Sequence, residues 1–123
     1  MIITSADAPT FEQGGTTAVG YASPSRGAAD VSLWRLAIAP GQTSPTHSLT
    51  HEEVFLALAG SATATVGDCR QDLVAGDCLV VPRGVPFTLA TGSDGLEAVC
   101  AMPSGGQATI LPDGPTLTPP WAV

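Results

Sequence analysis

Two stretches of the chain decide its fold: residues 40–60 read PGQTSPTHSLTHEEVFLALAG, and residues 76–87 read GDCLVVPRGVPF. In both stretches, glycine and proline separate short runs of apolar and β-branched residues, a pattern typical of strands joined by tight turns. A turn often requires a backbone conformation that only glycine adopts without strain. We therefore expect Gly41, Gly60, Gly76 and Gly84 to lie at strand ends.

The same pattern extends over most of the chain and predicts an all-β protein. No segment places apolar residues at helical spacing over three turns, whereas several alternate with the period of a strand that has one buried face. Gly67-Asp68 and residues 93–95 are expected to form hairpin turns. Many short strands with regular turns indicate a sandwich or a barrel. The expected strands cover residues 16–22, 30–39, 53–59, 61–66, 70–74, 78–81, 85–91 and 96–102.

Length and composition indicate one compact domain over residues 1–123. Chains divide into several domains only beyond roughly 250 residues, and a single core suffices at this length. The longest apolar runs fall far short of the ~18 residues that a membrane-spanning helix needs. We expect the motifs within residues 40–91 to form the centre of the domain. The Gly/Pro-rich tail, residues 103–123, should lie extended over the barrel, anchored by Trp121.

The charges exclude several classes of function. The chain has 4 basic and 11 acidic residues, for a net charge of −7, and all four basic residues are arginines. So few cations cannot neutralise a run of phosphates, so we expect neither nucleic acid nor an anionic membrane as a partner. The lack of lysine excludes Schiff-base chemistry and a P-loop lysine.

The number and spacing of the three cysteines, Cys69, Cys78 and Cys100, indicate the redox state of the compartment in which the protein is expected. Their number is odd, and no C-x-x-C pair occurs, so neither a disulfide framework nor a zinc site is indicated. We find no secretion signal in the sequence. Together these observations predict reduced thiols and a cytoplasmic location, with each cysteine acting as a small apolar strand residue.

His47 and Glu53 are the residues most suited to carry chemistry. In one continuous strand they would lie roughly 20 Å apart, at about 3.3 Å per residue. They can meet only if residues 49–52 form a turn that reverses the chain. A buried carboxylate needs a partner, so we expect Glu53 to face the imidazolium of His47, while Glu52 faces solvent.

The spacing of these residues resembles the two sequence motifs of the cupin superfamily. The first stretch reads G-x5-H-x-L-x3-E-x6-G from Gly41 to Gly60, and the second reads G-x5-P-x-G-x2-F from Gly76 to Phe87. Cupins are small jelly-roll β-barrels, so the resemblance implies a cupin-type double-stranded β-helix. It also implies a homodimer formed by sheet-to-sheet packing. Ile2-Ile3 and residues 16–22 are candidates for that contact, because exposed strand edges tend to find partners.

In that family, the first motif supplies two histidines and a glutamate to a metal, and the second supplies a third histidine. His47 matches the first histidine and Glu53 the glutamate, but Leu49 and Phe87 stand in the other two positions. Two ligands of four seldom hold a divalent ion, so the metal site looks degraded and no cofactor is favoured. A divalent metal stays possible if His51 swings inward to join His47 and Glu53; otherwise His51 is a solvated turn residue.

The two substitutions have a second consequence. In the family's fold, Leu49 and Phe87 would form an apolar wall opposite His47 and Glu53, which is the usual character of a small-molecule site. The alternative is that these side chains fill the barrel and leave no cavity. Trp34 alternates with Leu36 and Ile38 on one strand face, which suggests a place in the core or at an interface.

Three functions follow from this interpretation. The first is a small-molecule-binding cupin that catalyses isomerisation, epimerisation or cyclisation without a metal, with His47 as base and Glu53 orienting it. The second is a metal-dependent enzyme, dioxygenase-like, that uses His47, His51 and Glu53. The third is a non-catalytic ligand sensor. Fold alone does not choose among them.

Overall fold

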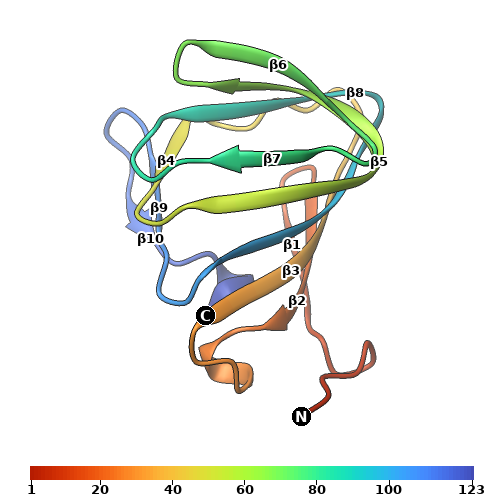
Figure 1. Cartoon of the computed structure of the whole chain (residues 1–123), viewed down its shortest axis with the longest axis vertical. Coiled ribbons are helices and arrows are strands. Elements are labelled where there is room, and N and C mark those ends of the chain that lie inside the picture. The colour runs from red at the N-terminus through yellow and green to blue at the C-terminus, as the bar shows by residue number, and fades with distance from the viewer.

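The structure is a computed structural model that describes residues 1–123. It consists of β-strands and two short 3-10 helices (Figure 1). The strands are β1 (Thr10–Gln13), β2 (Thr16–Ala22), β3 (Val31–Ile38), β4 (His47–Leu49), β5 (Glu53–Val66), β6 (Cys69–Val74), β7 (Cys78–Val81), β8 (Phe87–Pro103), β9 (Ala108–Ile110) and β10 (Thr116–Leu117). The helices are η1 (Pro24–Arg26) and η2 (Pro120–Ala122). No helix of the chain has the length and apolar character needed to cross a membrane.

All ten strands belong to one antiparallel sheet that curls on itself into a barrel (Figure 1). Strand β8 connects the two parts of this sheet. On one side it pairs with β3, which continues through β2 to β1. On the other side it pairs with β5, which also holds β6 and β7. The predictions of an all-β chain and of a barrel are thereby confirmed.

The longest strands, β5 and β8, bend where a pair of glycines meets. Sequence analysis predicted a hairpin turn at residues 93–95, but these residues continue β8, which pairs with β5 from Val54↔Ala101 to Val66↔Phe87. The register shifts next to Gly60, and both Gly60 and Gly95 have positive φ angles, 76° and 68°. A sharply bent strand therefore stands where the glycine signal indicated a turn, because glycine serves both purposes.

Two other turns lie where the sequence placed them. Gly67-Asp68 joins β5 to β6 as a tight hairpin, with Val66 opposite Cys69. The chain also reverses between β4 and β5, through residues 50–52. This second reversal brings His47 and Glu53 into the same barrel.

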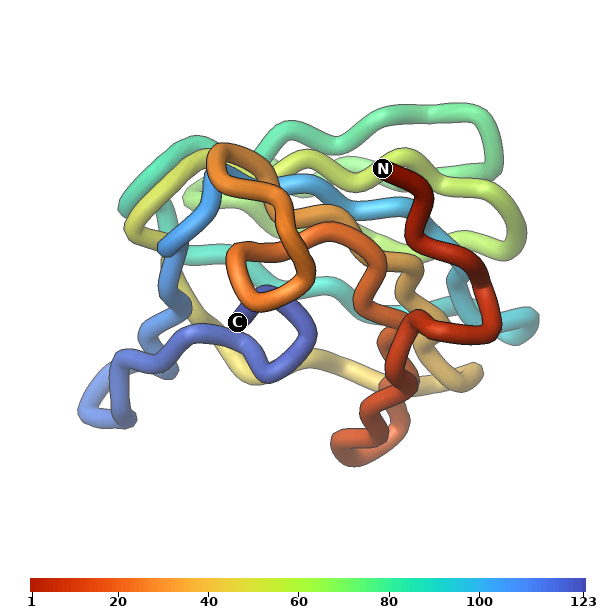
Figure 2. Tube along the Cα trace, turned by 90° about the horizontal axis from the view of Figure 1, so that it is seen from below, coloured from red at the N-terminus to blue at the C-terminus, as the bar shows by residue number.

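The tail forms part of the barrel as well as covering it. Strand β9 pairs with β4, and β10 pairs with β9. The chain then ends in η2, which packs against β2 and β3. Seen from below, the C-terminal turn crosses the barrel beside the loop that follows β2 (Figure 2).

Exposed apolar side chains gather on the outer face of the sheet, on β3, β5 and β7. Leu56 and Val80 project there from the paired strands β5 and β7, and Leu33 projects from β3 on the other side of β8; all three are between a third and a half exposed. Strand β2, expected to offer a free edge, instead pairs with β1 and β3 on its two sides. The homodimer stays a prediction: Ile2, the other candidate contact, is almost fully exposed, and this outer face offers further apolar surface.

The meeting of Gly60 and Gly95 leads to a test of the fold. A methyl group added at Gly60 would overlap the carbonyl oxygen of Gly95, whereas one added at Gly41 would meet nothing within 4 Å. Gly60→Ala should lower the free energy of unfolding by about 3 kcal/mol or more, since backbone overlap adds to the left-handed conformation. Gly41→Ala, whose φ of 68° is comparable, should cost only ~1–2 kcal/mol. Equal losses in urea unfolding would contradict the bent-strand arrangement.

Candidate functional site

The barrel is not filled by its own side chains: it encloses a cavity of about 380 Å³. That volume lies within the usual range of small-molecule sites, roughly 300–1,000 Å³. The walls come from β3, β4, β5, β8 and β9, and the two ends of the chain complete them. The tip of the β1–β2 hairpin contributes Gln13 and Thr16, and the tail contributes Trp121.

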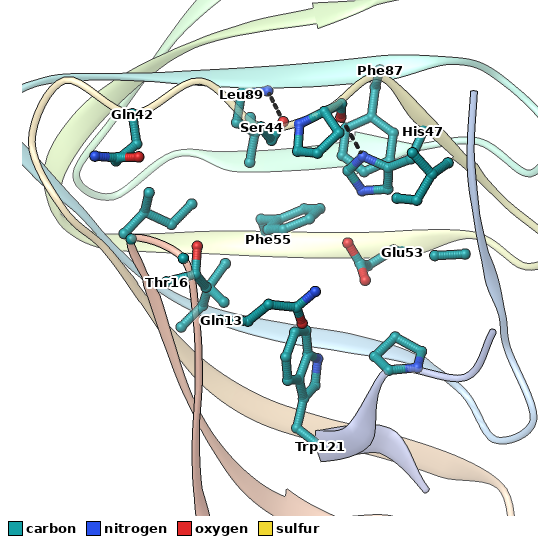
Figure 3. A pocket seen from close by; sticks show the side chains of 18 of the residues that line it. Gln13, Thr16, Gln42, Ser44, His47, Glu53, Phe55, Phe87, Leu89 and Trp121 are labelled. Atoms are coloured by element: carbon teal, nitrogen blue, oxygen red, sulfur yellow. Dashed lines mark hydrogen bonds between the residues drawn. The ribbon is translucent and has the colours of Figure 1, made fainter. Parts of the chain in front are cut away.

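His47 enters the cavity from β4 (Figure 3). Its Nδ1 lies 2.8 Å from the carbonyl oxygen of Pro45, which can only accept a hydrogen bond, so Nδ1 carries the proton. The Nε2 lone pair then points into the cavity. The ring packs on Phe87 with the ring centres 4.2 Å apart.

Burial keeps His47 uncharged. Desolvation lowers the pKa of the imidazole below its ordinary value of 6.5, and the hydrogen bond to Pro45 offsets this only in part. At neutral pH, His47 is therefore a neutral base with Nε2 available to accept a proton.

Glu53 enters the cavity from the first position of β5, opposite Val81 of β7. Its side chain is 6% exposed and forms neither a hydrogen bond nor an ion pair, the single ion pair of the protein being Arg35–Glu97. Burial without a compensating charge raises the pKa of this carboxyl from 4.5 to about 8. At neutral pH, Glu53 is mostly protonated and able to donate a hydrogen bond.

The expected imidazolium–carboxylate pair does not form. His47 and Glu53 face the same space from different strands (Figure 3), but no ion pair joins them. The prediction assumed that a buried carboxylate must find a cation. The structure corrects it: burial favours the uncharged form of both groups, so the imidazole can accept a proton and the carboxyl can donate one. Environments that move two pKa values apart in this way are typical of acid–base catalysis.

The metal alternative meets a different obstacle. No three His, Cys, Asp or Glu side chains are grouped to hold a metal ion. His51 does not line the cavity, and its Nδ1 lies 2.9 Å from the hydroxyl oxygen of Thr50 in the turn before β5. Leu49 and Phe87 line the cavity and offer no donor atom. These side chains therefore do not provide the set of ligands that a divalent ion needs.

Apolar side chains form much of the cavity wall, and no cation lines it. Trp34, Leu36, Phe55 and Leu89 form its walls, and none of the four arginines reaches it. Any charged ligand would thus lose its hydration without gaining a counter-charge, which is costly. The geometry favours an electrically neutral ligand.

The polar residues at the rim of the cavity were not predicted from the sequence. Gln13 and Gln42 line the cavity from the β1–β2 hairpin and from the loop after β3 (Figure 3). Neither lies in a motif, so no local signal marked them. Ser44 lies between Gln42 and His47 and fixes this loop, since its Oγ accepts a hydrogen bond from the Leu89 amide at 2.9 Å.

The cysteines do not supply a nucleophile to the cavity. Cys69 and Cys78 are exposed on β6 and β7, and none of the three cysteines lines the cavity. Cys100 is buried in the core behind it, where burial and the nearby Glu53 raise the pKa of its thiol. This thiol stays protonated and acts as an apolar core residue.

The raised pKa of Glu53 predicts a change of stability with pH. Between pH 4.5 and about 8, the folded protein keeps a proton that the unfolded chain has lost, so Glu53 makes the wild type less stable as pH rises. Glu53→Gln removes this loss. Its stability advantage over wild type should grow by roughly 1 kcal/mol per pH unit across this window.

Thermal unfolding at several pH values measures that difference. Glu52→Gln is the matched control, because Glu52 is the exposed neighbour of Glu53. The stability of Glu52→Gln should change with pH in the same way as that of the wild type. If Glu53→Gln showed the same pH dependence as wild type, Glu53 would be ionised in the folded protein.

Comparison with solved structures supports the fold. The polyketide cyclase RemF from Streptomyces resistomycificus superposes with a TM-score of 0.77 at 20% sequence identity, over 93% of this chain and 87% of that chain. Oxalate decarboxylase from Bacillus subtilis, which has Mn(II) centres, superposes with a TM-score of 0.74 at 19% identity. That match covers 82% of this chain but only 28% of the decarboxylase.

No curated protein matches the chain in sequence. A family model for the cupin domain does match, over residues 34–102, which is more than half of the chain. The matched segment contains His47, Leu49, Glu53 and Phe87, the residues from which the resemblance was argued. By fold and by sequence, then, this chain belongs to the cupin family.

Proposed function

We propose that the chain is an acid–base enzyme that transfers a proton at a carbon atom next to a carbonyl group of a neutral small molecule. One observation carries this proposal: a neutral imidazole and a protonated carboxyl face the same apolar cavity from different strands. Removal of such a proton is the step shared by isomerisation, epimerisation and many cyclisations.

The walls define the class of substrate. Four aromatic side chains, Trp34, Phe55, Phe87 and Trp121, line the cavity, and flat rings pack well against such surfaces. The lack of a cation disfavours carboxylates and phosphates. The substrate is therefore a neutral, flat, largely apolar carbonyl compound. The likeness to a polyketide cyclase of similar length agrees with this class.

The proton transfers balance without any further group. Nε2 of His47 removes the proton from carbon, and the electron pair of the broken C–H bond moves toward the carbonyl oxygen. The carboxyl proton of Glu53 passes to that oxygen, which gives the neutral enol. The products of this half-reaction are the enol, an imidazolium and a carboxylate. Return of a proton from His47 to the same or another carbon, and from the enol to Glu53, completes isomerisation.

Deuterium exchange into α-tetralone, a neutral bicyclic aromatic ketone, tests the proposal. In D₂O the wild type should accelerate exchange of the hydrogens next to the carbonyl, as followed by proton NMR. His47→Ala should reduce this rate by about 10²-fold or more, the usual contribution of a general base. His51→Ala, the control, should leave the rate unchanged because His51 lies outside the cavity. Equal effects of the two substitutions, or binding of the ketone without exchange, would overturn the catalytic role.

The pH profile of the exchange reaction provides a separate prediction. The rate at low ketone concentration should rise as pH increases through the lowered pKa of His47, below 6.5. It should fall again as pH passes about 8, where Glu53 loses its proton. In Glu53→Gln, whose amide still donates a hydrogen bond, the fall at high pH should disappear. A falling limb retained in that variant would assign it to another group.

A further inference from the structure

The last residues of the chain form a strap, residues 119–123, that closes one side of the cavity. Seen from below, the strap lies beside the loop that follows β2 (Figure 2). Three successive carbonyl groups of the strap accept hydrogen bonds from side chains about one hundred residues earlier in the sequence. The donors are Arg26 to Trp121, Ser32 to Ala122, and both Ser23 and Ser25 to Val123.

We call these four donor side chains the clamp. They hold the strap partly through buried groups and not only through surface contacts. Ser23 and Ser32 are fully buried, as polar groups rarely are without a purpose. The guanidinium of Arg26 also donates to the Tyr21 carbonyl, at 3.3 Å. It reaches the strap across Gly20, where any side chain would collide with Arg26 and come within 2.9 Å of the Trp121 carbonyl oxygen.

The clamp fixes Trp121 in the wall of the cavity. The indole lies 6.5 Å from Trp34, centre to centre, and below Glu53 and Gln13 in the close view (Figure 3). Its Nε1 is the one side-chain nitrogen or oxygen that is completely shielded and has no hydrogen-bond partner, whereas the Glu53 carboxyl, which also has none, lines the cavity. A buried N–H group without an acceptor is costly, so an indole held there by a strap with four hydrogen bonds, one of them to Trp121 itself, calls for an acceptor.

An acceptor atom of a ligand would reach the indole from the cavity, which Trp121 lines. Gln13 lies next to the upper end of the indole in the view of Figure 3 and lines the cavity with it, and its side chain makes no hydrogen bond within the protein. It comes from the exposed tip of the β1–β2 hairpin. A ligand that enters the cavity can therefore displace Gln13 from the indole without breaking a hydrogen bond.

We infer that Trp121 is a substrate-binding residue that packs against the ligand and donates its Nε1–H to an oxygen atom of it. Arg26 is a positioning residue that acts through Trp121. This inference rests on the proposed function and narrows the substrate: beside the carbonyl that faces His47 and Glu53, the neutral aromatic ligand carries a second oxygen substituent.

A series of α-tetralones with one hydroxyl group at successive positions of the aromatic ring tests the inference. By calorimetry, at least one should bind the wild type about tenfold more tightly than unsubstituted α-tetralone, as one hydrogen bond provides. Trp121→Phe keeps an aromatic ring but removes the N–H, so the gain should vanish. A gain that persists in Trp121→Phe, or the lack of any gain in wild type, would overturn the inference.

Arg26 offers a second variant outside the cavity, should Trp121→Phe fold poorly. For the best hydroxylated ketone, Arg26→Met should raise the half-saturation concentration for deuterium exchange about tenfold while the limiting rate is kept, and Arg26→Lys should restore part of the binding. A fall in the limiting rate alone would overturn the positioning role.

The two proposals fail separately. His47-dependent exchange of unsubstituted α-tetralone without any hydroxyl effect would leave the proposed function standing and overturn the role of Trp121. A hydroxyl gain that depends on Trp121, without any exchange, would do the reverse.

Discussion

A carboxyl group buried without a cation beside it governs the chemistry of this barrel. Glu53 begins a strand at the centre of the sheet, so its side chain cannot turn outward without moving β5 away from β7. It therefore meets apolar surroundings, and its proton becomes hard to remove. A group that would be an anion on the surface is here a hydrogen-bond donor at neutral pH.

Leu49 and Phe87 extend the same constraint to His47. Where the family has histidines, these side chains replace donor atoms with apolar surface, and Phe87 lies directly against the imidazole. Desolvation lowers the pKa of His47 as it raises that of Glu53, because in both cases it opposes the charged form. Apolar side chains at these two positions thus offer no metal ligand, and they favour the uncharged form of the imidazole beside them.

The sequence could predict what depends on local pattern and on motif spacing. Alternation and turn residues located β2 and β7 to the residue, and the motif spacing placed His47, Leu49, Glu53 and Phe87 in one barrel. The glycine signal at residues 93–95 led to the wrong prediction of a turn, because a bent strand and a turn need the same backbone freedom. The predicted ionised state of Glu53 was also wrong. The pKa of a buried carboxyl depends on whether a cation lies beside it, and none lies beside Glu53. Trp121 was expected only to anchor the tail, as nothing in its neighbourhood showed the clamp that aims it into the cavity.

Chemistry and recognition come from different parts of the chain. The acid–base pair lies within residues 34–102, which match the cupin domain, whereas Gln13, Arg26 and Trp121 lie outside them. The two ends of the chain meet over the cavity because Arg26 and its neighbouring serines bind the strap. Changes in the hairpin tip or the strap can therefore alter which ligand fits without disturbing His47 or Glu53. Under the proposed function, such a barrel would keep one proton-transfer reaction while its ends select the substrate.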